Sequence, residues 1–158
     1  MNRPDAAAPA LITPFEPQRP TLLASGLISL WILVLSIPML AGKFLGSPYS
    51  DQWKAGYAYR LWGAEQWKAT GHIPLWNPEI YGGLPFVAAM HGDIFYPTAW
   101  LRLILPTAFV MNWEFPVHYI LAGLFAYWLL RKLNLSWAGA VTGAMSYELS
   151  GVILSYVA

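Results

Sequence analysis

The feature that most constrains the fold is an uncharged, strongly apolar run of 22 residues from Thr21 to Gly42. A bilayer core about 30 Å thick is crossed by roughly 20 residues of α-helix, because each residue adds about 1.5 Å. The run therefore predicts a transmembrane helix over 21–42. Pro38 is expected to kink or end this helix near its last turn, since proline lacks an amide hydrogen.

Composition supports the same interpretation. Of the 158 residues, 57% are hydrophobic and only 11% are charged, and the mean hydropathy is +0.44. Soluble domains are about a quarter charged, so this chain has too few charges to coat a soluble surface. The net charge of +1 indicates no nucleic-acid partner. Cysteine is absent, which excludes disulfides and thiolate metal sites.

Two further spans are expected in the second half of the chain, over 107–130 and 136–158. The first ends in the apolar run YILAGLFAYWLL, and the second is rich in alanine and glycine. Residues 1–20 contain five prolines and predict a solvated tail. The sequence thus predicts an all-α membrane protein with about three transmembrane helices.

The connection over 43–107 is expected to be a large extracytoplasmic loop. Within it, 51–70 has aromatic residues at helical spacing and predicts a helix lying at the membrane interface, with Gly71 as its stop. The orientation follows from the basic residues beside the spans. Arg131 and Lys132 in the short turn, and Arg19 before the first span, place the N-terminus in the cytoplasm.

Few side chains suggest chemistry, and no phosphate-binding loop, catalytic triad or metal-ligand spacing is present. Asp51 opens the interfacial helix, where it is either an N-cap or a general base at the membrane surface. His91 and Asp93 fall in one turn, where the carboxylate could orient the ring, although a local turn hydrogen bond is the plainer alternative. No metal site is predicted.

Ionisable residues also occur inside the two later spans. Glu114 and His118 share a helix face, and they form either an interfacial hydrogen-bonded pair or a functional one. A neutral His118 could also ligate a bacteriochlorophyll magnesium or a haem iron. Glu148 lies midway through the third span and needs a buried partner. Gly139 and Gly143 form a small-residue seam that predicts close contact with another helix.

The stretch from Ser50 to Pro106 resembles the first extracytoplasmic loop of the YfhO-like family, bacterial multi-spanning proteins of the GT-C glycosyltransferase class. The most diagnostic pieces are Ser50-Asp51-Gln52, 71–78, 82–86 and Phe95-Tyr96-Pro97. The resemblance covers about residues 21–158. It implies the bacterial cytoplasmic membrane, a polyprenyl-phosphate sugar donor, a divalent cation, and Asp51 as base or metal contact, with Asp93 second.

This chain is much shorter than members of that family, so two functions remain open. The first is a non-catalytic accessory subunit of a larger integral membrane complex, held by other membrane subunits and by the bilayer. A pigment-containing, photosynthetic complex is one host compatible with His118. The second is the N-terminal portion of a polyprenyl-phosphate-sugar-dependent membrane glycosyltransferase.

Overall fold

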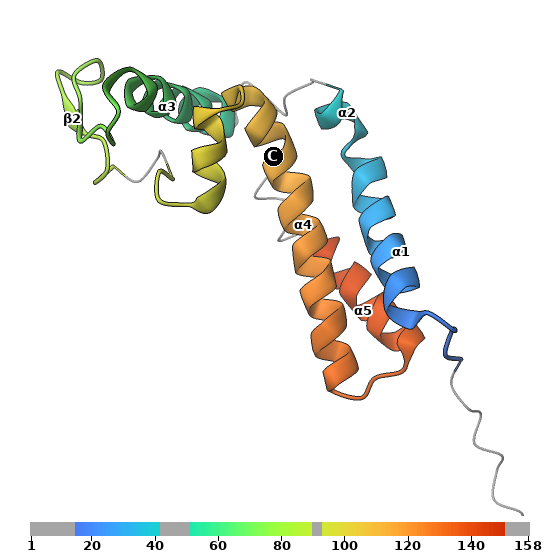
Figure 1. Ribbon diagram of the computed structural model, residues 1–158. Coiled ribbons are helices and arrows are strands. Elements are labelled where there is room, and N and C mark those ends of the chain that lie inside the picture. Colours follow the sequence, from blue (N-terminus) through green and yellow to red (C-terminus); the bar gives the residue numbers. More distant parts are fainter. Residues whose placement is uncertain (1–14, 42–50, 90–92, 151–158) are drawn as a thin grey trace, which may run out of the picture.

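The computed structural model describes residues 15–41, 51–89 and 93–150, and these are mostly helical (Figure 1). The helices are α1 (Pro20–Leu35), α2 (Ile37–Leu40), the π-helix η1 (Gln52–Tyr57), α3 (Ala58–Thr70), the 3-10 helix η2 (Pro97–Leu103), α4 (Thr107–Lys132) and α5 (Trp137–Glu148). Two short strands, β1 (Trp76–Asn77) and β2 (Leu84–Pro85), pair antiparallel, with Trp76 opposite Pro85 and Asn77 opposite Leu84.

These elements form two parts. α1, α4 and α5 pack together, and we call them the bundle. η1, α3, the two strands and η2 form a second part, the head, which lies beside the N-terminal end of α4 (Figure 1). α4 contacts elements of both parts, so it is the helix that joins them.

The bundle has a core of small and medium side chains at which the three helices meet. Its buried members are Ala24 and Ile28 of α1, Tyr127 of α4, and Ala140, Val141 and Ala144 of α5. Alanine at these positions lets the helix backbones approach closely. The N-terminal chain closes one end of the bundle, because the Trp137 indole N–H donates to the Pro20 carbonyl at 2.8 Å.

The head has its own core, built around Phe86 between α3 and the strand pair. Phe86 is 1% exposed and packs with Tyr59 and Ile94. Its ring covers Gly63 of α3, where a Cβ atom would meet the ring carbon Cε1 at 3.0 Å. Glycine at position 63 therefore allows the ring to lie directly on the helix backbone.

The predicted fold class, an all-α membrane protein with about three transmembrane helices, is wrong. Among the described residues, no helix combines the length and the apolar character that crossing a bilayer requires. The run over 21–42 is divided between α1, which ends at Leu35, and the short α2. With 16 residues, α1 has a length of about 24 Å against a bilayer core of about 30 Å. The strand pair β1–β2 is a further departure from an all-α fold.

The other two predicted spans differ from transmembrane helices for separate reasons. α4 is long enough at 26 residues, but Glu114, Arg131 and Lys132 lower its mean hydropathy. α5 has only 12 residues. The last part of the predicted span over 136–158, residues 151–158, lies outside the described residues. So do most of the predicted tail, the first part of the connection over 43–107, and His91.

The predicted interfacial helix over 51–70 consists of two elements. Residues 52–57 form the π-helix η1, and α3 continues to Thr70. Gly71 follows with φ +77°, a left-handed conformation that glycine adopts without steric cost. Asp51 directly precedes η1, and its side chain makes no capping hydrogen bond.

Candidate functional site

The most elaborate polar arrangement in the described residues is a charge cluster centred on Asp93, where the head meets α4. Arg102 of η2 donates two hydrogen bonds to the Asp93 carboxylate, at 2.5 and 2.8 Å. Arg60 of α3 donates a third at 2.9 Å. The two bonds from Arg102 make its pairing with Asp93 bidentate, which is the strong geometry for guanidinium and carboxylate groups. Arg102 is 2% exposed, so its side chain lies out of water, whereas the Asp93 side chain is 24% exposed.

A second carboxylate extends the cluster to α4. Glu114 accepts a short hydrogen bond from the Thr98 hydroxyl of η2, and its other oxygen lies 3.6 Å from an Arg102 nitrogen. Arg60 also donates to the Gln52 side chain of η1 at 2.9 Å. The cluster contains two arginines and two carboxylates, so its formal charges cancel. Its bonds all run between side chains, and they link η1, α3, η2 and α4.

The two candidate catalytic carboxylates have different surroundings. Both Asp93 oxygens accept hydrogen bonds from arginines, which makes this side chain a structural anchor rather than a free base. Asp51 is exposed and forms no ion pair within the described part of the chain. The described contacts connect them only indirectly, since Gln52, the neighbour of Asp51, bonds to Arg60, which binds Asp93.

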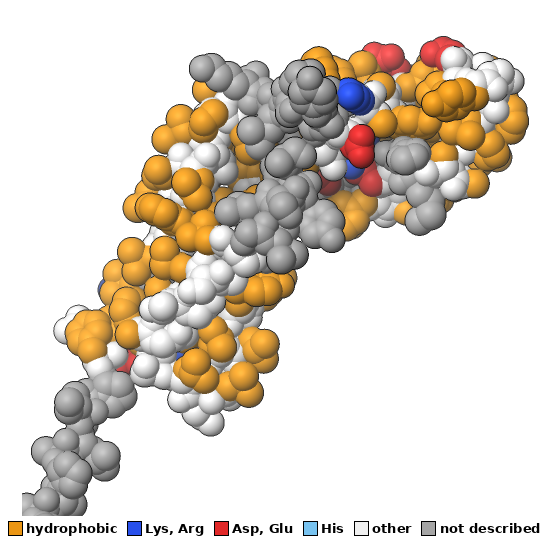
Figure 2. Space-filling model, turned by 180° about the vertical axis from the view of Figure 1, so that it is seen from behind, with side chains coloured by type: hydrophobic (Ala, Val, Ile, Leu, Met, Phe, Trp, Pro, Cys, Tyr) orange, Lys and Arg blue, Asp and Glu red, His pale blue; other side chains and the backbone are white. Residues whose placement is uncertain are grey.

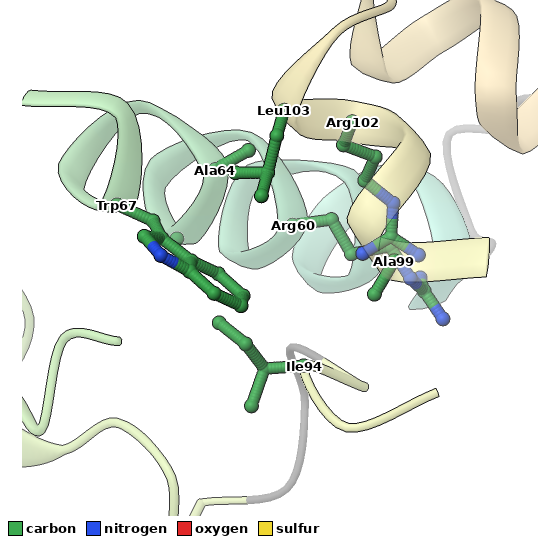
Figure 3. A pocket seen from close by; sticks show the side chains of 8 residues that line it. Arg60, Ala64, Trp67, Ile94, Ala99, Arg102 and Leu103 are labelled. Atoms are coloured by element: carbon green, nitrogen blue, oxygen red, sulfur yellow. The ribbon is translucent and has the colours of Figure 1, made fainter. Parts of the chain in front are cut away.

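The space beside this cluster is small. Figure 3 shows Arg60 and Arg102 extending toward the same point from α3 and η2, with Trp67 and Ile94 close by. The cavity that they line has a volume of only about 10 Å³. One water molecule needs about that much room, so a sugar phosphate does not fit there. In residues 15–41, 51–89 and 93–150, no three His, Asp or Glu side chains gather as metal ligands.

His118 of α4, the candidate pigment ligand, has both ring nitrogens engaged. Nδ1 lies 2.6 Å from the Glu114 carbonyl oxygen, which can only accept, so Nδ1 carries the hydrogen. In the neutral ring, Nε2 then accepts from the Tyr96 hydroxyl at 2.5 Å. A magnesium or haem iron bound at Nε2 would have to displace Tyr96. The described contacts thus show a hydrogen-bonded ring.

The three residues predicted to mediate helix packing lie at different places in the bundle. The Gly139 amide donates to the capping hydroxyl of Ser136 at 3.3 Å. Gly143 faces α4 of the same chain, where a Cβ atom would lie 2.6 Å from a Leu130 methyl carbon. Glu148 is 0% exposed, and neither carboxylate oxygen has a hydrogen-bond partner among the described residues. Burial raises the pKa of Glu148 to about 7.

Sequence reasoning did not identify Arg60, Tyr96, Thr98 or Arg102 as members of a polar site. One signal was available for Arg102, which stands in the apolar run WLRLIL. A charge within such a run must find a partner when the segment folds. That partner is Asp93, nine residues earlier, and the same carboxylate also accepts from Arg60, 33 residues before it, a contact that only the fold determines.

Comparison with known proteins does not assign the chain to a family. No family model, curated protein or solved structure matches the chain. The resemblance to the YfhO-like family therefore stays a prediction.

Proposed function

We propose that the chain is a non-catalytic accessory subunit that packs through the apolar outer faces of α1 and α4 against integral membrane proteins of a larger complex. The observation that carries this proposal is the exposed apolar surface of these two helices. On α1 and α2 it comprises Leu22, Leu23, Leu27, Leu30, Trp31, Val34, Leu35 and Ile37; on α4 and its C-cap residue it comprises Phe109, Trp113, Val117, Leu121, Phe125, Trp128, Leu129 and Leu133.

This surface is unusual in both size and charge. Leu22, Leu30 and Leu129 are each exposed by 60% or more. α1 and α2 contain no charged residue, and α4 contains none between Glu114 and Arg131. Figure 2 shows apolar side chains along the bundle, with the charged ones gathered mainly toward the head in this view. Contiguous apolar patches on this scale are typical of surfaces that pack against a protein or a membrane.

The polar cluster at Asp93 fits the same proposal. Its side chains bind one another and hold the head against α4, which is a structural role. On this proposal the chain belongs to the bacterial cytoplasmic membrane and to the partners embedded in it. We do not propose the glycosyltransferase as a second function, because neither the anchored Asp93 nor the small cavity beside it favours a sugar-transfer site.

The proposal is tested by native electrophoresis of gently solubilised membranes from the bacterium that makes this chain. The wild-type chain is expected to migrate within a larger complex of membrane proteins. Leu30→Lys places a charge on the outer face of α1 and should release the chain from that complex. Leu75→Lys is the matched control, because Leu75 is 72% exposed in the head. Migration of the wild-type chain alone would contradict the proposal.

A further inference from the structure

A second apolar feature lies between α4 and α5, where the two helices leave an open groove of about 540 Å³. The small residues Ala122, Ala126 and Gly143 leave room in it, and Phe125, Leu129 and Tyr147 supply apolar surface. None of the described residues that line it is charged. Its volume is within the range of about 300–1,000 Å³ that is typical of sites for small ligands. Such a groove suits a flexible hydrocarbon chain.

The charges beside the groove indicate which polar group is attached to the hydrocarbon chain that the groove suits. α4 ends in Arg131 and Lys132, one turn beyond the groove residue Leu129. Arg131 is held by Glu16, with a nitrogen–oxygen distance of 2.6 Å. Lys132 is exposed and makes no hydrogen bond or ion pair within the described ranges. Lys132 lies three residues after Leu129 and therefore near the same face of the helix.

We infer that the α4/α5 groove binds one acyl chain of an anionic phospholipid and that Lys132 binds its phosphate. An apolar groove that ends beside an unpaired cation complements an amphiphile with a hydrocarbon chain and a negative head. Arg19 adds positive charge at this end of the bundle, since the chain after it is tied to Trp137 by the bond to Pro20. The inference does not rest on the proposed protein docking, although Phe125 and Leu129 belong both to the groove and to the apolar face of α4.

The experiment uses the full chain, purified in detergent and free of any partner. Phosphatidylglycerol or phosphatidylcholine carrying a photoactivatable acyl chain is added, and adducts are counted by native mass spectrometry and mapped by peptide sequencing. We expect a one-to-one adduct, formed about fivefold more with the anionic lipid, since one lysine near an anionic headgroup contributes about that preference. The label should map to Phe125, Leu129 or Tyr147.

Two groups of variants separate the groove from the cation. Ala122→Phe and Ala126→Phe fill the groove and should abolish the adduct with both lipids, whereas Ala69→Phe on exposed α3 should not. Lys132→Gln should remove only the preference for phosphatidylglycerol, and Lys68→Gln should leave it. Circular dichroism checks that each variant folds.

Three outcomes would overturn the inference. The first is labelling confined to the outer face of α1, and the second is an unchanged adduct in a folded groove-filling variant. The third is equal labelling of the wild-type chain by both lipids, which would refute the role of Lys132. If both groove-filling variants fail to fold, the position of the label on the wild-type chain still tests whether the lipid binds in the groove. Because no partner protein is present, a negative result here leaves the proposed docking function untouched.

Discussion

The carboxylate of Glu148 occupies the space that a side chain at Gly123 would need. A Cβ atom at Gly123 would approach both carboxylate oxygen Oε2 and the carboxyl carbon of Glu148, the latter at 2.9 Å, and would also lie 2.8 Å from a methyl carbon of Ile28. Glycine in α4 thus lets α5 bury an acidic side chain against the helix backbone, beside α1. This contact joins all three helices of the bundle.

Gly123→Ala should destabilise the protein. Alanine favours a helix over glycine by about 1 kcal/mol, but the added methyl group overpacks this site, at a cost of about 1–3 kcal/mol. We expect a net loss of stability in thermal unfolding followed by circular dichroism. Gly26→Ala in α1 is the matched control, since a Cβ atom there meets nothing within 4 Å, and it should be neutral or stabilising. Equal effects of the two substitutions would show that Gly123 is not a packing site.

The stability of the protein should fall as the pH rises toward neutral because of Glu148. Burial raises the pKa of this carboxyl from 4.5 to about 7 in the folded chain, so the folded state holds a proton that the unfolded state releases. The stabilisation is complete below pH 4.5 and is lost progressively up to about pH 7, by about 3 kcal/mol in all.

Glu148→Gln keeps the shape of the side chain and cannot ionise. The difference in unfolding free energy between the wild type and this variant, measured in urea from pH 4 to pH 8, should therefore follow the titration of Glu148. The variant should be the more stable of the two at pH 8. A difference that does not change with pH would mean that the carboxyl is not buried in solution.

Breaking the partly buried ion pair between Asp93 and Arg102 should cost more than breaking an exposed one. Asp93→Asn removes the charge opposite Arg102, whose side chain is 3% exposed, and should destabilise the protein by about 3 kcal/mol or more. Glu16→Gln breaks the exposed pair with Arg131 and should cost less than about 1 kcal/mol. Urea unfolding measures both. The double variant Asp93→Asn with Arg102→Met should recover part of the loss, and strict additivity would contradict the pairing.

In its neutral form, the His118 ring should carry its hydrogen on Nδ1. The Glu114 carbonyl fixes that tautomer, and Tyr96 donates to Nε2. Nitrogen-15 NMR of histidine-labelled protein reports the protonation of each ring nitrogen directly. Tyr96→Phe removes the donor to Nε2, so the Nε2 resonance should shift while Nδ1 stays protonated, and stability should fall by about 1 kcal/mol. His72 is exposed in the head and gives the reference spectrum. A hydrogen on Nε2 in the neutral ring would contradict this geometry.

The sequence by itself determined where most of the described helices lie. The apolar pattern over 107–130 predicted a helix that the structure has at Thr107–Lys132, and Gly71 was expected to end the helix that stops at Thr70. These features depend on neighbours within one or two turns, so a local pattern is enough to predict them. The length of α1 was not determined in this way, because the uncharged run continues past Leu35, where the helix ends.

Only the tertiary structure decided which side chains meet. Asp93 was a candidate base by its residue type, and the fold surrounds it with Arg60 and Arg102 from two other elements. Glu148 was expected to need a buried partner, and α1 and α4 of the same chain enclose it because Gly123 and Ile28 leave a space of its size. Such contacts depend on the packing of segments far apart in sequence. Hydrophobic periodicity does not predict which of these segments a side chain will face.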